Sequence, residues 1–141
     1  MITNVKGKIL KIGIDWVDID LGPIALRINV PSSSIYSLGK SGDTVILFTS
    51  MQVREDSMTL YGFESDESRS SFESLISING VGPRLGLAIM SMFSVSDLTQ
   101  AVNTEDQLAF SKVPGVGKKT AGRIILELKG QLAKGLSAVD T

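Results

Sequence analysis

A short glycine-rich turn occurs twice in this sequence, and the repeat restricts the possible folds more than any other feature. The first copy is Ile78-Asn79-Gly80-Val81-Gly82-Pro83-Arg84, and the second, 35 residues later, is Val113-Pro114-Gly115-Val116-Gly117-Lys118-Lys119. Apolar residues with helical spacing precede and follow both turns. A small residue follows each turn at the same distance, Gly86 in one copy and Ala121 in the other, where two helices would approach closely. Each copy therefore predicts two helices joined by a tight turn.

The chemistry of this turn favours the binding of an anion. A Gly-hydrophobe-Gly triplet allows positive φ angles and leaves the main-chain amides uncovered by side chains. The second glycine opens a helix, whose first N–H groups lack an intrahelical acceptor and whose dipole attracts negative charge. We expect Val81 and Val116 to point inward, and Arg84, Lys118 and Lys119 to surround the turns with positive charge. This is the pattern of the helix-hairpin-helix motif, which contacts the DNA backbone and not the base edges.

Two other glycine motifs do not fit these turns. A Walker A loop would require glycine at Lys112 and a hydroxyl residue at Lys119. A dinucleotide-binding fingerprint would require a preceding strand and a third glycine one residue earlier than Gly86. A pair of structural hairpins without a ligand stays open as an alternative.

The residue types that are missing restrict the chemistry further. The chain has 141 residues, enough for two small domains, and contains neither cysteine nor histidine. Disulfides, cysteine nucleophiles, most zinc sites and the usual general base are therefore excluded, and we expect no metal and no cofactor. No apolar segment is long enough to span a membrane, and the N-terminus does not resemble a signal peptide. We expect a cytoplasmic protein.

The net charge of −1 is unusual for a protein that binds nucleic acid. The charge is, however, unevenly distributed. Residues 1–70 contain seven basic and nine acidic residues, whereas residues 71–141 contain seven basic and six acidic residues. Binding would therefore depend on a few backbone contacts per chain, and several chains would have to act together.

Residues 1–63 have the pattern of β-structure, in which apolar and polar residues alternate between turn residues. A helix after a serine cap is expected at 31–38. Three strands, one helix and two strands are the element order of an OB-fold, a five-stranded Greek-key barrel that is common among nucleic-acid-binding proteins. This fold alone does not identify a ligand. The predicted strands are 5–12, 16–21, 24–30, 44–53 and 58–63.

The predicted hairpin between the last two strands has an acidic tip, formed by Glu55 and Asp56. A solvated polar turn is the ordinary interpretation of such a tip. In a chain whose other half binds phosphates, the tip would instead repel the DNA backbone and keep strands apart.

After Phe63 the periodicity changes from two to about 3.6 residues, which marks a domain boundary. We expect a barrel at 1–63, an all-α tandem helix-hairpin-helix domain at 64–134 and the start of a linker at 135–141. Helix caps are expected at Ser65 or Asp66, at Ser94 and at Thr104. The last helix is expected to run over 118–129 and to stop at Gly130. Gly122, inside that helix, has no evident reason other than a close contact.

Three motifs, in this order, resemble the RuvA family of bacterial Holliday-junction proteins. They are Val53-Arg54-Glu55-Asp56 followed by Leu60-Tyr61-Gly62-Phe63, then Asn79-Gly80-Val81-Gly82, then Pro114-Gly115-Val116-Gly117-Lys118-Lys119-Thr120-Ala121. The resemblance covers nearly the whole chain. It implies a fourfold homotetramer that holds a four-way DNA junction open and flat, as one or two tetramers per junction.

The resemblance also assigns roles to residues and partners. Glu55 and Asp56 would form an acidic pin near the crossover. The RuvB motor would supply the ATPase and drive branch migration, and the RuvC resolvase would act alongside, so no residue of this chain would be catalytic. The implied DNA contacts are Gly80, Val81, Gly82, Arg84, Gly115, Val116, Gly117, Lys118, Lys119, Thr120 and Arg123.

The family pattern includes a third helical domain that engages the motor, and this sequence stops before it. We therefore expect the chain to bind junctions without driving branch migration. Two other classes of function stay open. A repair enzyme, either a glycosylase or a nuclease, could use the same helix-hairpin-helix units, and a protein-interaction scaffold would not bind DNA at all.

Overall fold

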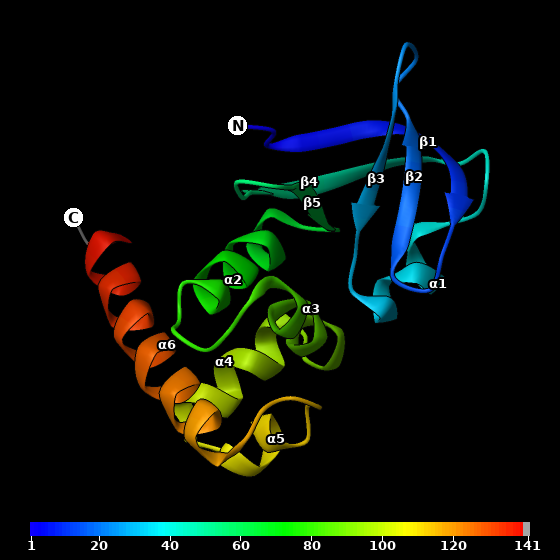
Figure 1. The fold of residues 1–141 in the computed structure, drawn as a ribbon. Helices are drawn as coiled ribbons and strands as arrows, with labels where there is room; N and C mark the ends of the chain where they lie inside the picture. Colours follow the sequence, from blue (N-terminus) through cyan, green and yellow to red (C-terminus); the bar gives the residue numbers. More distant parts are fainter. Residues whose placement is uncertain (140–141) are drawn as a thin grey trace. The chain divides into compact units, whose positions relative to one another are not determined.

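The structure, a computed structural model, describes residues 1–139 of the 141, and the side chains of residues 1–131. The chain divides into two compact units, Met1–Ser70 and Ser71–Thr141. Figure 1 shows the strands in the first part of the chain and most of the helices in the second. The domain limits given above, 1–63, 64–134 and 135–141, stay predictions.

The first unit is a closed five-stranded barrel in the order β1-β2-β3-β5-β4 (Figure 1). Neighbouring strands pair antiparallel except β3 and β5, which pair parallel. This architecture confirms the predicted OB-type fold, and the predicted strand ends differ from the observed ones by at most one residue. The strands are β1 (Asn4–Ile12), β2 (Trp16–Asp20), β3 (Ala25–Asn29), β4 (Thr44–Val53) and β5 (Met58–Phe63).

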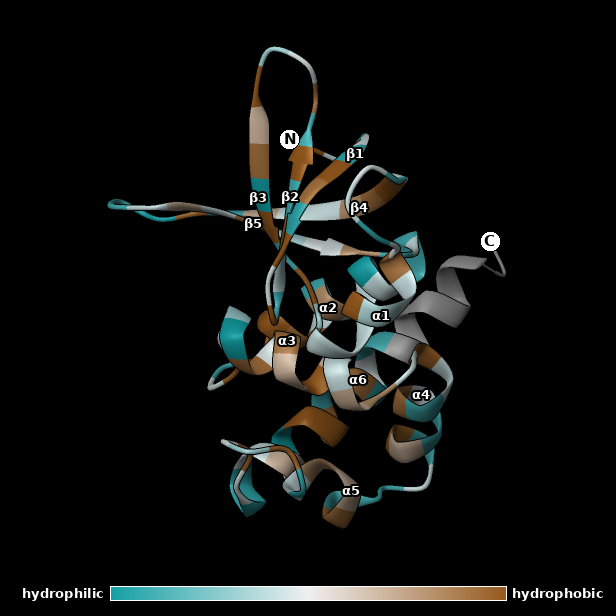
Figure 2. Cartoon of the chain, turned by 90° about the vertical axis from the view of Figure 1, so that its right-hand side faces the viewer, coloured by the Kyte–Doolittle hydropathy of each residue, from teal (hydrophilic) through white to brown (hydrophobic). Residues whose placement is uncertain are grey.

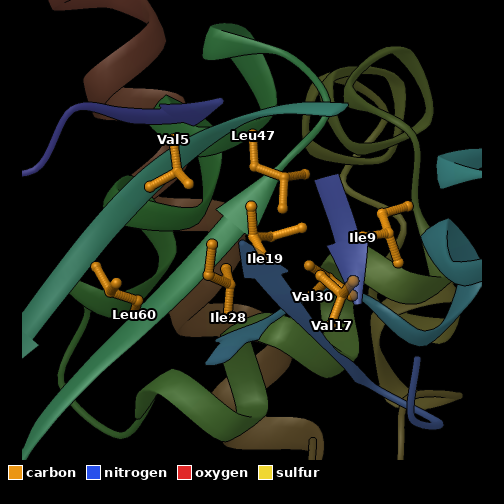
Figure 3. Close-up of a cluster of buried hydrophobic side chains, with 8 residues drawn as sticks. All are labelled: Val5, Ile9, Val17, Ile19, Ile28, Val30, Leu47 and Leu60. Atoms are coloured by element: carbon orange, nitrogen blue, oxygen red, sulfur yellow. The ribbon is translucent and has the colours of Figure 1, made fainter. Parts of the chain in front are cut away.

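The barrel is filled by apolar side chains at alternate strand positions, because successive residues of a strand face opposite sides. Gly62 in β5 is part of this packing, since a Cβ there would lie 2.6 Å from Cγ2 of Ile28. Any larger residue at that position would disturb the core. The buried cluster, drawn in Figure 3, contains Val5, Ile9, Val17, Ile19, Ile28, Val30, Leu47 and Leu60.

The segment between β3 and β4 forms a short 3₁₀ turn, η1 (Ser32–Ser34), followed by α1 (Ile35–Leu38). The predicted helix is therefore present, but the predicted serine cap is wrong. Pro31 precedes η1, and no side chain makes a capping hydrogen bond at either element. A proline at this position fixes φ near −60°, which starts the turn without a side-chain acceptor.

The outer face of β2 and β3 carries a charged and aromatic network. The guanidinium of Arg27 donates from Nε to Oδ1 of Asp18 at 2.8 Å and from Nη2 to Oδ2 at 3.0 Å. Its central carbon also lies 3.7 Å from the centre of the Trp16 ring. The hydrogen bond from Arg27 lowers the pKa of Asp18 below its usual range, and burial opposes this shift only in part.

This shift predicts an acid dependence of barrel stability. Because the pKa of Asp18 is lower in the folded chain, its contribution is present above the unfolded pKa, near 4, and is lost as the pH falls through the folded pKa. The free energy of unfolding should therefore decrease with acidification more steeply in the wild type than in Asp18→Asn. Denaturant titrations between pH 6 and pH 2, followed by the fluorescence of the single tryptophan, test this. Parallel curves for the two proteins would contradict it.

The second unit is helical. Its helices pack around a shared apolar core that includes Phe72, Leu75, Ile89, Phe110 and Ile124, each fully buried. Gly86 lets two helices approach closely, as predicted, since a Cβ there would lie 2.9 Å from Cγ2 of Ile76. The helices are α2 (Asp66–Ile76), which begins in the first unit, α3 (Pro83–Met92), α4 (Val95–Asn103), α5 (Gln107–Ser111) and α6 (Lys118–Val139).

Two of the three predicted helix caps are confirmed. The Oγ of Ser65 accepts the N–H of Ser68 at 3.1 Å, and the Oγ of Ser94 accepts the N–H of Asp97 at 3.0 Å. The predicted cap at Thr104 is wrong, because Thr104 ends α4 and its hydroxyl donates to the carbonyl of Gln100.

The true cap of α5 is Asp106, whose Oδ1 accepts the N–H of Ala109 at 3.1 Å. Glu105 has φ of 53°. This left-handed residue reverses the chain direction, so the next helix begins two residues later than the pattern suggested.

The predicted stop at Gly130 is also wrong, because α6 continues to Val139. One glycine costs a helix only about 1 kcal/mol, and the residues that follow are mostly good helix formers. The predicted linker at 135–141 overlaps α6 as far as residue 139, and residues 140–141 lie outside the described residues. Gly122 makes no close contact, since a Cβ there would lie 3.6 Å from Nε2 of Gln107, an ordinary distance.

Among the described residues, no single helix has the length and apolar character needed to cross a membrane. Taken together, α3 and α4 have the length and apolar composition of a membrane span, but the two helices are bent by 96° relative to each other.

Candidate nucleic-acid interface

The two glycine turns have the same hydrogen-bond geometry. In the first, the N–H of Val81 donates to the carbonyl of Ile78 at 3.0 Å, and in the second, the N–H of Val116 donates to the carbonyl of Val113 at 3.0 Å. The side chains of Val81 and Val116 are 4% and 6% exposed. The prediction that these valines point inward is confirmed. Because their N–H groups and side chains are occupied, each triplet leaves its two glycines as the candidates for contact.

The glycines provide the conformation and the open space that such a contact requires. Gly80 and Gly115 have φ angles of 94° and 96°, a region that disfavours any residue with a Cβ. A Cβ built on Gly80, Gly82 or Gly117 would meet no atom within 4 Å. At Gly115 it would lie 3.2 Å from Cδ1 of Leu85, so this turn is partly supported from one side.

The second glycine of each triplet lies at the start of a helix, α3 in the first hairpin and α6 in the second. Gly82 precedes α3 with extended backbone angles, φ of −83° and ψ of 174°, and makes no side-chain capping bond. The first hydrogen bond of each helix runs from the N–H of Gly86 to the carbonyl of Gly82 and from the N–H of Ala121 to the carbonyl of Gly117, both at 2.9 Å. The N–H groups before them in the first turn of each helix have no intrahelical acceptor, and the positive end of the helix dipole lies beside them.

The glycine N–H groups are free within the described part of the chain. Residues 1–131 provide no hydrogen-bond acceptor for the N–H of Gly80, Gly82, Gly115 or Gly117. Four such donors on exposed residues, in two matching turns, are the arrangement expected of an anion site.

Cationic side chains surround both turns, though unequally. Arg84 beside the first turn, and Lys118 and Lys119 beside the second, are exposed and make no ion pair within residues 1–131. Thr120 is half-buried at the start of α6. In sequence, one cation directly follows the first turn and two directly follow the second.

Arg123 has a different environment from the other predicted contacts. Its Nη1 donates to the main-chain carbonyl of Asn79 at 3.2 Å, in the first turn. Two turns further along α6, Nε2 of Gln131 donates to Oγ of Ser77 at 3.2 Å. Helix α6 of the second hairpin is thus connected at two points to the loop of the first.

In the barrel unit, the acidic residues lie at the end of a long hairpin. Strands β4 and β5 pair as far as Val53 and Met58, which are 59% and 70% exposed, and the N–H of Arg54 then closes the tip on the carbonyl of Ser57 at 2.8 Å. Glu55 and Asp56 are exposed and make no ion pair within the described residues. Figure 2 shows this hairpin extending away from the barrel with a hydrophilic tip.

Comparison with known proteins identifies the family. Residues 1–62 match the family model of the RuvA N terminal domain, and residues 72–129 match that of the SAM-like helix-hairpin-helix tandem. The Holliday junction branch migration complex subunit RuvA of Herpetosiphon aurantiacus is 44% identical over 131 residues, 93% of this chain and 66% of that protein. The subunits of the same name from Paraburkholderia phytofirmans and Paraburkholderia xenovorans are 42% and 41% identical over 139 residues, 99% of this chain and 72% of each protein. The chain belongs to the RuvA family.

Membership of the RuvA family confirms the resemblance inferred from the three motifs. The chain spans between 66% and 72% of the length of these RuvA relatives. A RuvA N-terminal domain followed by a helix-hairpin-helix tandem fits the binding of junction DNA, and the relatives are named as subunits of a branch migration complex. The open glycine amides and the acidic tip are the candidate features for such binding.

Sequence reasoning locates the turns and the tip of this RuvA chain but misses the bonds that α6 makes with the first turn. The patterns around Gly80 and Gly115 are local, and a local pattern can be found in a sequence. The bond between Arg123 and Asn79 joins residues 44 positions apart. No motif signals such a pair, and the family resemblance implies Arg123 only as one more phosphate contact.

Proposed function

We propose that this chain binds four-way DNA junctions by their shape, without reading base sequence, as the DNA-binding subunit of a branch migration complex. The observation that carries the proposal is the pair of open amide turns, each beside a helix N-terminus and free cations. Membership of the RuvA family supports the four-way junction as the form of DNA that the chain binds.

At each hairpin, a DNA phosphate would accept hydrogen bonds from the two glycine N–H groups and from the first turn of the following helix. Arg84, Lys118, Lys119 and the hydroxyl of Thr120 would add charge and hydrogen bonds around it. All of these donors address phosphate oxygens, which every sequence presents alike. Affinity should therefore depend strongly on salt and little on base sequence.

The acidic tip would act by repulsion. Glu55 and Asp56 lie on an exposed turn that attracts no cation of the described chain, so their charge is available to oppose a phosphate strand. Around a crossover point, such tips would favour an open arrangement of the arms over a stacked one. In a continuous duplex the same charge only weakens binding.

We further propose a homotetramer, in which four chains place their hairpins on the four arms. The net charge of −1 gives a single chain little general attraction to DNA. Linking several weak sites raises the effective concentration at each, so four chains could bind tightly without new contacts. One or two such tetramers would occupy a junction.

In this proposal the chain has no catalytic residue. The RuvB motor would supply ATP hydrolysis and the RuvC resolvase would cut the junction, with all three acting in the cytoplasm. No observation here favours the two alternatives, a repair enzyme or a scaffold that does not bind DNA. Release of DNA fragments after incubation with Mg²⁺ would show that the chain is an enzyme after all.

A binding titration tests the proposal. A labelled four-way junction and a linear duplex of equal length are titrated with the chain at the same salt concentration, and the mass of the complex is measured under native conditions. We expect the junction to bind at least about tenfold more tightly, since it engages several chains at once, with a mass that contains four or eight chains. Equal affinity for the two DNAs would contradict junction selectivity, and a complex of single chains would contradict the tetramer.

A further inference from the structure

We propose that Arg123 is a positioning residue for the first hairpin. By holding the carbonyl of Asn79, it would orient the N–H of Gly80 towards the DNA phosphate. This inference rests on the proposed function, because it assigns a role within the same phosphate site.

The peptide unit between Asn79 and Gly80 links the two groups concerned. The carbonyl of Asn79 and the N–H of Gly80 belong to the same peptide bond, and the described chain contains no cis peptide bond. In a planar trans peptide these two groups point in opposite directions. A donor that fixes the carbonyl oxygen on one side therefore fixes the direction of the N–H on the other. Nη1 of Arg123 is such a donor, at 3.2 Å from the oxygen.

The hydrogen bond from Val81 to Ile78 closes the first turn but does not involve the central peptide between Asn79 and Gly80, and little else restrains that peptide. Gly80 has φ of 94°, and no atom lies within 4 Å of the position of its absent Cβ. Glycine populates positive and negative φ about equally, so the peptide before it can rotate. A rotated peptide would present its carbonyl to the phosphate and repel it. The charged hydrogen bond from Arg123 favours the orientation that binds, and it also polarises the N–H.

The second hairpin is restrained by other means. The residue that corresponds to Asn79 is Pro114, whose ring fixes its φ angle, and Cδ1 of Leu85 would lie 3.2 Å from a Cβ built on Gly115. The position in the first copy that corresponds to Arg123 is Ala88, which carries no donor. The hydrogen bond from Arg123 therefore has no counterpart in the second hairpin, and the second hairpin can serve as the internal control for the first.

A direct bond from Arg123 to phosphate, which the family resemblance implies, would have a different effect when the side chain is removed. A direct bond contributes to the salt dependence of binding, because each neutralised phosphate releases counterions. A positioning bond acts on the N–H of one glycine and should leave the salt slope almost unchanged. Arg123 is exposed, so its truncation should leave the fold intact, which a thermal unfolding curve can check.

The first experiment compares Arg123→Ala with Lys119→Ala, a matched removal of one exposed cation on the same helix. Junction affinity is measured from 50 to 300 mM salt for both variants and the wild type. We expect Lys119→Ala to reduce the slope by about 0.9 for each phosphate that is no longer neutralised, and Arg123→Ala to weaken binding by about tenfold with the wild-type slope. An equal reduction of the slope in both variants would overturn the positioning role.

The second experiment observes the glycine directly. The full chain is labelled with ¹⁵N-glycine, and the amide signals of Gly80 and Gly115 are followed while a short duplex is added. In the wild type we expect both signals to shift, and in Arg123→Ala we expect the Gly80 shift to disappear while the Gly115 shift is kept. If Gly80 still responds fully in the variant, the inference is wrong. If neither glycine responds in the wild type, the proposed function itself fails.

Discussion

Replacing both helix-opening glycines with aspartate, Gly82→Asp together with Gly117→Asp, is expected to abolish junction binding without destabilising the fold. Gly82 has extended backbone angles that any residue can adopt, and neither glycine has an atom within 4 Å of its missing Cβ. The two side chains can therefore be added without strain. The affinity for the junction should then fall while the free energy of unfolding rises slightly.

The reason is that aspartate satisfies the same N–H groups that would bind the phosphate. Aspartate is among the preferred N-cap residues, so each replacement should stabilise its helix by a few tenths of a kcal/mol. The carboxylate then occupies the anion site and repels DNA. Loss of charged hydrogen bonds worth about 1.5–3 kcal/mol at each hairpin predicts at least a hundredfold weaker binding.

Fluorescence titration with a labelled junction measures the affinity, and thermal unfolding measures the stability. The matched control is Ser96→Asp with Gln107→Asp, which adds the same two charges to the first turns of α4 and α5. This control should weaken binding only a few-fold, through general repulsion. Wild-type affinity in the glycine double variant would contradict the phosphate sites, and a lower melting temperature would contradict the capping argument.

Reversing the charge of the acidic tip should produce the second largest effect, a loss of selectivity. In Glu55→Lys with Asp56→Lys, the tip attracts the strands that it repels in the wild type. We expect tighter binding to linear duplex and a junction-to-duplex preference reduced by about tenfold or more. Both residues are exposed and unpaired within the described chain, so the barrel should keep its stability.

The control for this experiment makes the same charge change elsewhere, at Asp15 and Glu67, which are also exposed. Asp15→Lys with Glu67→Lys should raise the affinity for both DNAs by a similar factor, because its charges are not directed at a crossover. The ratio of the two affinities is therefore the quantity to compare. An unchanged ratio in the tip variant would return Glu55 and Asp56 to the role of an ordinary solvated turn.

The parts of the fold that the sequence predicts correctly depend on local patterns. The barrel strands are placed within one residue, since alternation such as Val17 and Ile19 against Trp16 and Asp18 follows directly from strand geometry. The glycine turns are found for the same reason, because a Gly-hydrophobe-Gly triplet between helical patterns has few other conformations. The resemblance to the RuvA family also assigns a role to the acidic tip, and that role stays a prediction.

The prediction errors occur where two local sequence signals compete, or where residues far apart in the sequence determine the structure. Thr104 and Asp106 are both good capping residues, and the left-handed conformation of Glu105 determines which one is used. Gly130 is a common helix stop, but α6 continues through it, and Gln131 already contacts Ser77. The bond from Arg123 to Asn79 depends on the packing of two hairpins against each other, and no spacing rule within either hairpin contains it.

Binding of phosphate at the glycine turns can be observed directly at the four glycine amides. The full chain, labelled with ¹⁵N-glycine, is titrated with a four-way junction, and the amide signal of each glycine is recorded. The account predicts that Gly80, Gly82, Gly115 and Gly117 shift to lower field as their N–H groups bind phosphate, while glycines in the barrel such as Gly22 and Gly62 change little. If the junction binds and these four signals stay where they are in the free protein, the glycine turns are not the phosphate sites and the account is wrong.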